Sequence, residues 1–288
     1  MAGSGMDITS TTRLLAVIGH PIAHSLSPRI HNSAFRAQSL DFVYVAFDVQ
    51  PSALVTAVEG LRSLGFRGAN VTVPHKQHVL KLMDELDPLA ARVGAVNTVV
   101  NEEGRLLGHN TDVAGFSAAL RGVLPQGAAG KRCLVAGAGG AARAVVAALA
   151  AEGANTVWVF NRTSARAEEL CVAARQWGAA LCEPVRTESL LEVGRQADIV
   201  INATSVGLDP TVKATPVPVD IFSSRQVVVD LVYGRAATEF VSQARARGAE
   251  TIDGLDMLLM QAASSYTLWT GVQAPLDIMR SALVGTVN

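Results

Sequence analysis

The sequence predicts a two-domain α/β protein of parallel architecture. The prediction rests on the length of 288 residues, on a composition with 49% apolar residues, and on short apolar runs that alternate with helix-like stretches. A chain of this length is longer than most single domains, which have about 100 to 200 residues and one hydrophobic core. Alternating strands and helices are typical of parallel sheets, because each return to a parallel strand needs a helix-sized connection.

The first half of the chain is expected to alternate strands with helices. Strand-like apolar runs lie at 14–19, 41–49 and 65–73. Residues 51–64 carry apolar side chains near every third or fourth position, which is the helical period. A further helix is expected to begin at Pro28, because the fixed φ of proline suits the first turn of a helix.

The second half continues the alternation and ends in helices. Strand-like runs lie at 132–139, 155–161, 197–204, 226–233 and 249–253, and a helical pattern covers 164–174. A long helix is expected at 255–270 and a shorter one at 276–284. A helical tail of this kind can return to the first domain and complete it.

A linker is expected at 120–130, where Gly, Pro and Ala concentrate just before a strand that opens a new βαβ unit. The domain boundary therefore falls within 112–130. We place the first domain at 1–112, completed by 255–288, and the second domain at 113–254.

The charge pattern excludes two classes of partner. The formal net charge is −1 and no run of Lys or Arg occurs, so the basic surface of a nucleic-acid or anionic-membrane binder is missing. The expected partners are small molecules or a second copy of the chain, which leaves a monomer or a homodimer open.

The cysteines and the N-terminus favour a cytoplasmic protein. Cys133, Cys171 and Cys182 are too few and too scattered for a disulfide framework, and no Cys-x-x-Cys pair indicates zinc, so we expect no metal site. The N-terminus lacks a signal-peptide pattern. The apolar window 133–151 is interrupted by Arg143 and by glycines, which predicts a strand, a turn and a helix rather than a membrane span.

A glycine-rich turn predicts a dinucleotide site in the second domain. Gly137 permits a tight turn, Gly139 lets backbone N–H groups approach a pyrophosphate, and Ala142 allows close packing of helix on strand. The helix that follows presents its positive dipole end to the phosphates. The turn follows a strand, opens a helix and precedes a second strand, which is the context this motif needs. The alternative is a glycine-rich turn in an ordinary βαβ unit.

The end of that second strand predicts NADP. An Asp or Glu there would accept hydrogen bonds from a free ribose 2′-hydroxyl and repel a 2′-phosphate. The chain has Asn161, Arg162 and Thr163 instead, with Arg166 close behind. Guanidinium groups match a phosphate in geometry and charge, so NADP is favoured over NAD. The alternative is that both arginines are solvated side chains at a helix start.

Polar side chains follow the strand-like runs of the first half. Ser25 and Ser27 lie two apart, so in an extended segment they point the same way and can hold a carboxylate together. Alternatively, they form the cap and turn of the next helix. Lys76 comes just past a strand end, and Asp112 lies between small polar residues near the domain boundary. A lone lysine is usually a solvated surface group, so the lysine alone indicates little.

Together, these segments resemble the shikimate dehydrogenase family from about residue 17 to the end. The matching motifs are HSLSPRIHN (24–32), NVTVPHK (70–76), GAVNT (94–98), NTD (110–112), GAGGAAR (137–143), NRT (161–163), NATSVG (202–207) and DGLDMLLMQAA (253–263). The resemblance implies an N-terminal α/β substrate domain completed by the C-terminal helices, followed by a Rossmann-type NADP-binding domain. It also implies an oxidoreductase of aromatic amino-acid biosynthesis that interconverts 3-dehydroshikimate and shikimate with NADP(H).

The resemblance also assigns roles to individual residues. Lys76 and Asp112 correspond to the catalytic pair: the lysine exchanges the proton of the reacting oxygen, and the aspartate orients the lysine and the substrate hydroxyl. Ser25 and Ser27 correspond to the pair that binds the substrate carboxylate. The ring-hydroxyl contacts correspond to Thr72, Asn97, Tyr233 and Gln261. The NADP contacts correspond to Gly137, Ala138, Gly139, Gly140, Ala141, Asn161, Arg162, Thr163, Arg166, Thr204 and Gly254.

Simpler structural roles remain open for three of these side chains. Asn97 can serve only to close a turn, and Tyr233 and Gln261 can serve only to pack the domain junction. His75 and His109 depart from patterns common in the family, and each is either a loop neighbour or a group that perturbs the titration of the lysine.

Two alternatives to the leading function remain. A quinate/shikimate dehydrogenase paralogue is one, because His75, His109 and Met260 leave the preferred substrate open. Its NAD-using form is opposed by the lack of an acid after the second strand. A catalytically silent NADP-binding regulatory protein is the other, and it is opposed by the presence of both Lys76 and Asp112, which a pure binder does not need.

Overall fold

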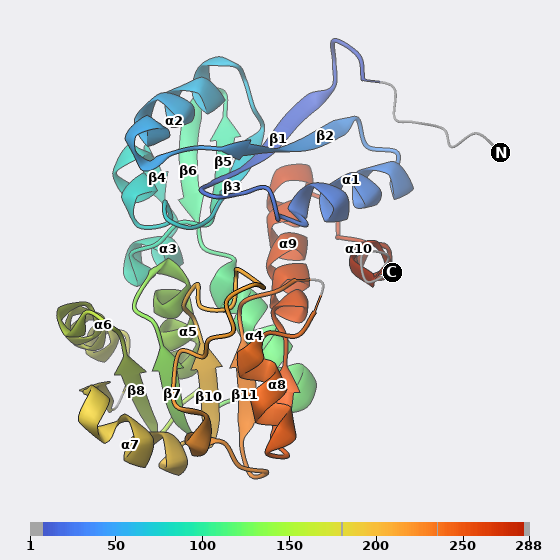
Figure 1. The fold of residues 1–288 in the computed structure, drawn as a ribbon. Coiled ribbons are helices and arrows are strands. Elements are labelled where there is room, and N and C mark those ends of the chain that lie inside the picture. The colour runs from blue at the N-terminus through green and yellow to red at the C-terminus, as the bar shows by residue number, and fades with distance from the viewer. Residues whose placement is uncertain (1–7, 180, 235, 285–288) are drawn as a thin grey trace. The chain divides into compact units, whose positions relative to one another are not determined.

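The computed structural model describes residues 8–179, 181–234 and 236–284, which form two units (Figure 1). The first unit comprises Met1–Thr111 and Ala262–Asn288, and the second comprises Asp112–Gln261. The helix α9 (Gly254–Thr270) runs from the second unit into the first.

The first unit is built on a mixed six-stranded sheet with the strand order β2-β1-β3-β5-β6-β4. Its strands are β1 (Arg13–Gly19), β2 (Phe42–Asp48), β3 (Gly68–Val71), β4 (Glu85–Leu86), β5 (Thr98–Glu102) and β6 (Arg105–His109). The strand β1 runs parallel to β2 and β3, whereas β5 runs antiparallel to both β3 and β6.

The β5–β6 hairpin corrects the expectation of a parallel sheet throughout this unit. The two strands join through Glu103 and Gly104, which both have positive φ angles (53° and 91°). Two successive residues of this kind form the tight turn that best matches strand twist. The sequence signal was weak because a glutamate is uncommon at such a position.

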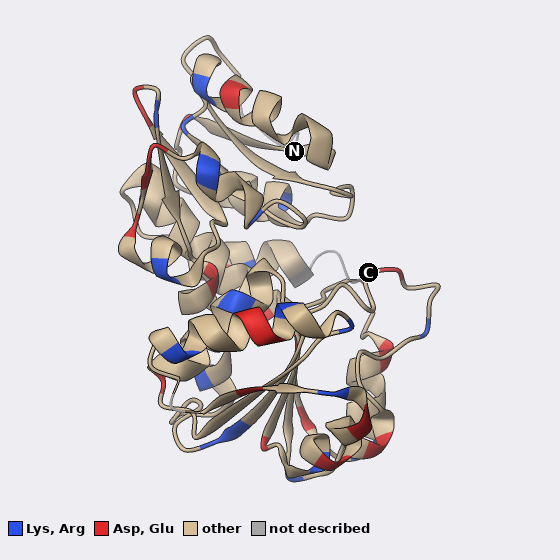
Figure 2. Cartoon of the chain, turned by 90° about the vertical axis from the view of Figure 1, so that its left-hand side faces the viewer, with Lys and Arg blue, Asp and Glu red and all other residues tan. Residues whose placement is uncertain are grey.

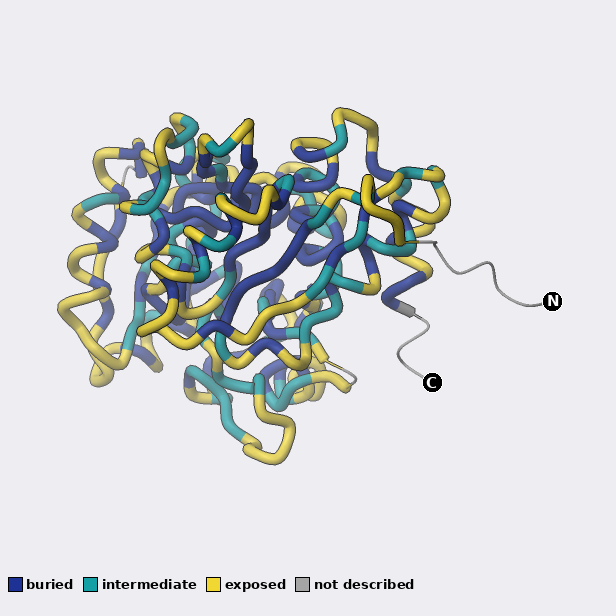
Figure 3. The backbone as a smooth tube through the Cα atoms, turned by 90° about the horizontal axis from the view of Figure 1, so that it is seen from above, coloured by how far each residue is buried: buried dark blue, intermediate teal, exposed yellow. Residues whose placement is uncertain are grey.

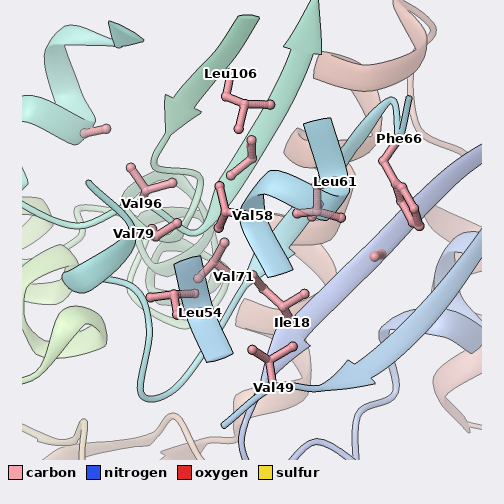
Figure 4. Packing of buried hydrophobic residues seen from close by; sticks show 14 residues of the cluster. Ile18, Val49, Leu54, Val58, Leu61, Phe66, Val71, Val79, Val96 and Leu106 are labelled. Atoms are coloured by element: carbon pink, nitrogen blue, oxygen red, sulfur yellow. The ribbon is translucent and has the colours of Figure 1, made fainter. Parts of the chain in front are cut away.

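Helices cover this sheet and close its core. They are α1 (Ser27–Ala37), α2 (Leu54–Ser63), α3 (Pro88–Val93) and α10 (Leu276–Val284), with short 3₁₀ turns at Pro51–Ala53 and His78–Leu82. Leu54, Val58 and Leu61 of α2 lie on one helical face and pack over Ile18 and Val71 of the sheet (Figure 4). The helical period expected at 51–64 is therefore present, although its first turn is a 3₁₀ turn.

From Ala262 onward, the C-terminal helices belong to the first unit, as the resemblance implied. In α9, the indole Nε1 of Trp269 donates to the carbonyl of Val99 at 2.9 Å, and Arg67 Nε donates to the carbonyl of Trp269 at 3.0 Å. These bonds link α9 to strand β5 and to the residue before β3. The expected return of the tail to the first domain is therefore confirmed.

The second unit holds a parallel six-stranded sheet with the strand order β12-β11-β10-β7-β8-β9. Its strands are β7 (Arg132–Ala136), β8 (Thr156–Phe160), β9 (Cys182–Val185), β10 (Ile199–Asn202), β11 (Val227–Asp230) and β12 (Glu250–Ile252). This is the doubly wound Rossmann order, in which the strand sequence reverses between the first and fourth strands. The predicted Rossmann-type fold is confirmed.

In the described residues of the second unit, five α-helices besides α9 flank this sheet. They are α4 (Asp112–Val123), α5 (Gly140–Ala151), α6 (Ser164–Gln176), α7 (Leu190–Gln196) and α8 (Glu239–Ala246), with 3₁₀ turns at Thr187–Ser189 and Val219–Ile221. The linker expected at 120–130 begins inside α4, so that part of the expectation is wrong. The division between the two units falls at Thr111 and Asp112 instead, and again at Gln261 and Ala262.

Burial and charge follow the pattern of ordinary globular units. The strands are mostly buried, whereas the outer helical turns and loops are exposed (Figure 3). Acidic and basic residues are interspersed on the helices and loops of the view in Figure 2. No helix in the described part of the chain has the length and apolarity needed to span a membrane. No group of three potential metal ligands occurs among the same residues.

Candidate active site

The predicted substrate residues of the first unit gather at one edge of its sheet. The strands β1, β3 and β6 end at this edge and β5 begins there, as shown by the pairs Ile18–Val71, Asn70–Thr98 and Thr98–His109. The loops that follow or precede these strands must therefore meet. They are the loops that carry Ser25, Ser27, Thr72, Lys76 and Asn97.

Backbone hydrogen bonds fix the loop that carries Thr72 and Lys76. The N–H of Thr72 donates to the carbonyl of Ile18 at 2.9 Å, and the N–H of Val96 donates to the carbonyl of Lys76 at 2.8 Å. His75 is buried, with its Nε2 at 2.6 Å from the carbonyl oxygen of Val49. The histidine thus anchors the loop, while Thr72 and Lys76 are partly exposed.

Asn97 is the most constrained of the predicted substrate residues. It is only 2% exposed, its carbonyl accepts from the N–H of Val71 at 2.8 Å, and its own N–H donates to the carbonyl of His109 at 3.1 Å. Its side-chain Oδ1 accepts from the N–H of Thr111 at 2.7 Å. Asp112, the first residue of α4 and 3% exposed, directly follows Thr111 in the chain.

The structure changes the interpretation of Ser25 and Ser27. We expected an extended segment, but Leu26 between them has right-handed helical angles and Ser27 is the first residue of α1. The Ser25 Oγ accepts from the N–H of Ser27 at 3.3 Å. The extended-segment argument for two parallel hydroxyls is therefore wrong. Ser27 lies instead in the first turn of α1, where backbone N–H groups favour an anion, and Ser25 lies just before the N-cap Leu26.

In the second unit, the glycine-rich turn has the geometry that a pyrophosphate requires. Gly137 has a φ of 117°, and a Cβ there would lie 2.6 Å from the carbonyl oxygen of Ala203. Gly139 is the N-cap of α5, and a Cβ there would meet no described atom within 4 Å. Gly137 is thus needed by the fold, whereas the space beside Gly139 is open to a ligand. The residues fit a bound dinucleotide phosphate.

The loop after β8 lies directly beside this turn. The N–H of Gly137 donates to the carbonyl of Phe160, the last residue of β8, at 2.7 Å. Asn161 Nδ2 then donates to the carbonyl of Thr163 at 2.9 Å, which closes the loop before α6. Arg162 and Arg166 are both exposed here. Both guanidinium groups are therefore available to a ligand at this loop.

A buried aspartate organises the neighbouring loops of the same unit. Asp230, at the end of β11, is 0% exposed and accepts from Asn202 Nδ2 and the N–H of Val232, both at 2.9 Å. Asn202 Oδ1 in turn accepts from the N–H of Thr204 at 3.0 Å. Thr238 Oγ1 donates to the other carboxylate oxygen of Asp230. Burial raises the pKa of Asp230 to about 6, and these hydrogen bonds oppose the rise.

The remaining predicted residues lie around these loops. Tyr233 lies between Asp230 and Thr238 along the chain and is partly exposed. Gly254 begins α9, where a Cβ would lie 2.7 Å from the carbonyl oxygen of Leu231, so the fold itself requires this glycine. Gln261 is buried, and its Nε2 donates to the carbonyl of Leu258 at 3.0 Å.

Sequence reasoning missed the buried polar residues that support the site. Asp230 and Asn202 each end a strand with a polar residue, but nothing in the sequence shows that they bind each other. Asn70 and Ser265 were missed for the same reason. Their side chains lie 3.1 Å apart, although they are far apart in the sequence.

Family models divide the chain in the same way as the fold does. Residues 17–99 match the model described as the shikimate dehydrogenase substrate binding domain. Residues 122–258 match the model of shikimate / quinate 5-dehydrogenase, and residues 254–284 match the shikimate 5'-dehydrogenase C-terminal domain. The chain belongs to the shikimate dehydrogenase family. The resemblance noted in the sequence motifs is confirmed.

Individual members of the shikimate dehydrogenase family match over nearly the whole chain. Shikimate dehydrogenase (NADP(+)) of Moorella thermoacetica is 49% identical over 285 residues, which cover 96% of this chain and 95% of the relative. A crystal structure of shikimate 5-dehydrogenase from Thermus thermophilus in complex with NADP(H) and shikimate matches with a TM-score of 0.83 and 40% identity, covering 95% of this chain and 99% of that one. Quinate dehydrogenase from Corynebacterium glutamicum in complex with NAD matches with a TM-score of 0.86 and 34% identity, over 95% and 99% of the two chains.

The raised pKa of Asp230 predicts a pH-dependent stability term. Because the folded-state pKa of about 6 exceeds the ordinary value of 3.8, ionisation of Asp230 opposes folding. This penalty is absent below the unfolded-state pKa of 3.8. It grows as the pH rises from 3.8 to about 6 and is constant at higher pH, where the carboxyl is ionised in both states. Its full size is about 3 kcal/mol.

We predict that Asp230→Asn, which keeps the side-chain shape, removes this term. The unfolding free energy of the variant relative to the parent should rise by roughly 3 kcal/mol between about pH 4 and pH 7.5. Denaturant unfolding of both proteins across this range measures the difference. A difference that stays constant with pH would show that Asp230 keeps an ordinary pKa.

Proposed function

We propose that this protein is an NADP-dependent shikimate dehydrogenase that interconverts shikimate and 3-dehydroshikimate. The observation that carries the proposal is the edge of the first sheet, where hydrogen bonds fix the loops of Thr72, Lys76 and Asn97 next to one another. Relatives named as NADP-dependent shikimate dehydrogenases support it. The reaction is one step of aromatic amino-acid biosynthesis.

Lys76 and Asp112 handle the proton in this proposal. Oxidation of a secondary alcohol removes a hydride from carbon and a proton from oxygen, and NADP(H), when bound, supplies the hydride acceptor or donor. The Lys76 ammonium exchanges the proton and stabilises negative charge on the oxygen. Asp112 accepts a hydrogen bond from the reacting hydroxyl and so orients it.

The other residues hold the substrate and the nucleotide. Ser25 and Ser27, at the N-terminal end of α1, bind the carboxylate. The ring hydroxyls are bound by Thr72, Asn97, Tyr233 and Gln261. The glycine-rich turn at 137–141 binds the pyrophosphate. The loop at 161–166 binds the 2′-phosphate, and Thr204 and Gly254 complete the nucleotide contacts.

The domain roles and the biological setting are part of the same proposal. The first unit, which we assigned to 1–112 and 255–288, binds the substrate, and the second, assigned to 113–254, binds NADP. The three cysteines are free and buried, which a reducing cytoplasm permits. A monomer or homodimer remains the expected assembly. The NAD-using form of the quinate alternative is not favoured, because the loop after β8 holds no acid. The regulatory alternative is not favoured, because both Lys76 and Asp112 are present.

We predict that Lys76→Met lowers kcat for shikimate oxidation by about 10²- to 10⁴-fold, the usual contribution of a positioned acid–base group. Methionine keeps most of the side-chain length and removes the charge and the proton. NADP affinity should stay unchanged, because the second unit binds the nucleotide. Initial rates and NADP titration measure both quantities.

Lys81→Met is the matched control, because Lys81 is exposed on the 3₁₀ turn that follows the same loop. Asp112→Asn should also be severely impaired. The double variant of Lys76 and Asp112 should be little worse than the poorer single variant, because both act on the same proton. Near-normal turnover by Lys76→Met would refute the proton-transfer role, and His75 or His109 would then be examined first.

We predict that Arg162→Ala weakens NADP binding by roughly ten- to hundredfold, the value of a charge-assisted hydrogen bond of about 1.5 to 3 kcal/mol. NAD binding should change little, because NAD lacks the 2′-phosphate. Nucleotide titrations of the parent and the variant measure both affinities. Arg225→Ala is the control, because Arg225 is exposed before β11, at the opposite edge of the same sheet. Equal losses for both nucleotides would contradict the assignment.

We predict that the double variant Ser25→Ala, Ser27→Ala raises KM for shikimate more than it lowers kcat. The carboxylate is bound in both the ground and transition states, so its loss removes uniform binding. Steady-state rates measure the split, and Ser33→Ala, later in α1, is the control. If neither parameter moves, the serines only cap the helix, as their geometry also permits.

A further inference from the structure

A buried cluster of neutral polar side chains lies behind Asn97 in the first unit. It is formed by Asn70 of β3, Thr98 of β5, Thr111 after β6 and Ser265 of α9. Each is 6% exposed or less, and Thr98 and Ser265 are fully buried. Burying polar groups costs free energy unless they are hydrogen-bonded, and all four of these side chains have hydrogen-bond partners.

Ser265 lies at the centre of this cluster. Its Oγ is 2.8 Å from Thr98 Oγ1, 3.1 Å from Thr111 Oγ1 and 3.1 Å from Asn70 Nδ2. The indole of Trp269, on the same helix, binds a backbone carbonyl of β5 instead. Ser265 is thus a point at which α9 contacts the polar side chains at the edge of the sheet.

The direction of the hydrogen bonds is set from the far side of the cluster. The Tyr44 hydroxyl donates to Asn70 Oδ1 at 2.7 Å, because this oxygen has no hydrogen to give. Asn70 Nδ2 therefore faces the cluster, where its two hydrogens have three acceptors at 3.1 Å: Ser265 Oγ, Thr98 Oγ1 and the carbonyl oxygen of Asn97. With its oxygen accepting from Asn70, the Ser265 hydroxyl is able to donate its own hydrogen to one of the two threonines.

Thr111 connects Ser265 to the side-chain amide of Asn97. Its N–H donates to Asn97 Oδ1 at 2.7 Å, and its Oγ1 accepts from Asn97 Nδ2 at 2.9 Å. These two bonds, together with contacts of the Thr98 and Thr111 hydroxyls to Asn97 Oδ1 at 3.1 and 3.2 Å, hold the amide plane of Asn97 in one orientation. Since Thr111 Oγ1 also contacts Ser265, displacement of the threonine hydroxyl would change the orientation of the asparagine amide.

We infer that Ser265 is a positioning residue for substrate recognition: through Thr111 it orients the side-chain amide of Asn97 toward a ring hydroxyl of the substrate. The inference rests on the proposed function. Ser265 itself does not bind the substrate in this account. Its effect is on the affinity for the hydroxylated ring and not on the proton transfer or on the nucleotide.

A mutant cycle between Ser265 and Asn97 tests the inference. Ser265→Ala should raise KM for shikimate by about five- to tenfold, the value of one buried hydrogen bond, with kcat changed less than about twofold and KM for NADP unchanged. In the Asn97→Ala background, the same substitution should change KM for shikimate less than about twofold, because the amide that Ser265 orients is gone. Steady-state kinetics of the four proteins measure this coupling.

Thr267→Ala is the matched control, because Thr267 lies on the same helix, is exposed and donates from its hydroxyl to the carbonyl of Ala263 one turn earlier. It should leave both KM values unchanged. Ser265→Cys, which keeps the side-chain size and weakens the hydrogen bonds, should give an intermediate KM and guards against poor folding of the alanine variant. Thermal unfolding checks that all variants are folded.

Two results would overturn the inference. An equal rise in KM in both backgrounds would show that Ser265 only anchors α9 to the sheet, and an unchanged KM in folded Ser265→Ala or Ser265→Cys would show that it has no role in recognition. If the parent protein itself fails to oxidise shikimate with NADP, the proposed function falls and the inference falls with it, which distinguishes the two failures.

Discussion

The hydrogen bond from the Thr111 N–H to Asn97 Oδ1 joins the two loops on which the first unit's candidate site depends. Asn97 also accepts from the N–H of Val71 and donates to the carbonyl of His109, so one residue connects the ends of β3 and β6. Because these groups are buried, leaving any of them unpaired would cost free energy. The positions of Lys76 and Thr72 follow from this connection, since Val96 binds the Lys76 carbonyl.

In the second unit, a carboxylate holds the corresponding loops together. There, Asp230 and Asn202 end the adjacent strands β11 and β10 and bind the loops that follow them, whereas in the first unit Asn70 lies inside β3 and Asn97 directly precedes β5. The difference is that a carboxylate responds to pH, whereas hydroxyls and amides do not titrate near neutrality. The loops of Thr204 and Tyr233 are therefore linked to a titratable group, and the loop of Asn97 is held by a neutral cluster.

Much of the fold was predictable because it depends on local pattern. Apolar runs indicated the strands β1, β7 and β10 to within a few residues, and the helical period indicated α2 and α9. The hairpin of β5 and β6 was missed because its turn, with Glu103 at a positive φ, lacks the usual Asn-Gly signal. The sequence also indicated the loops of the candidate site, because polar residues there directly follow buried strands.

The supporting contacts were not predictable in the same way. That Ser265 meets Thr98, or that Asp230 meets Thr238, depends on how distant segments pack, and a polar residue in a helix has many possible partners. The prediction that Ser25 and Ser27 lie in an extended segment was wrong for a related reason. The helix α1 begins earlier than the position of Pro28 suggests. Local signals thus locate the candidate site, and tertiary packing determines how it is held.

We propose that shikimate and NADP are the preferred pair of substrates of this protein. Initial rates of the unmodified protein with shikimate and with quinate, each with NADP and with NAD, test it most directly. The account predicts the highest kcat/KM for the pair of shikimate and NADP. A highest value for quinate with NAD, or no turnover with any of the four pairs, would contradict it.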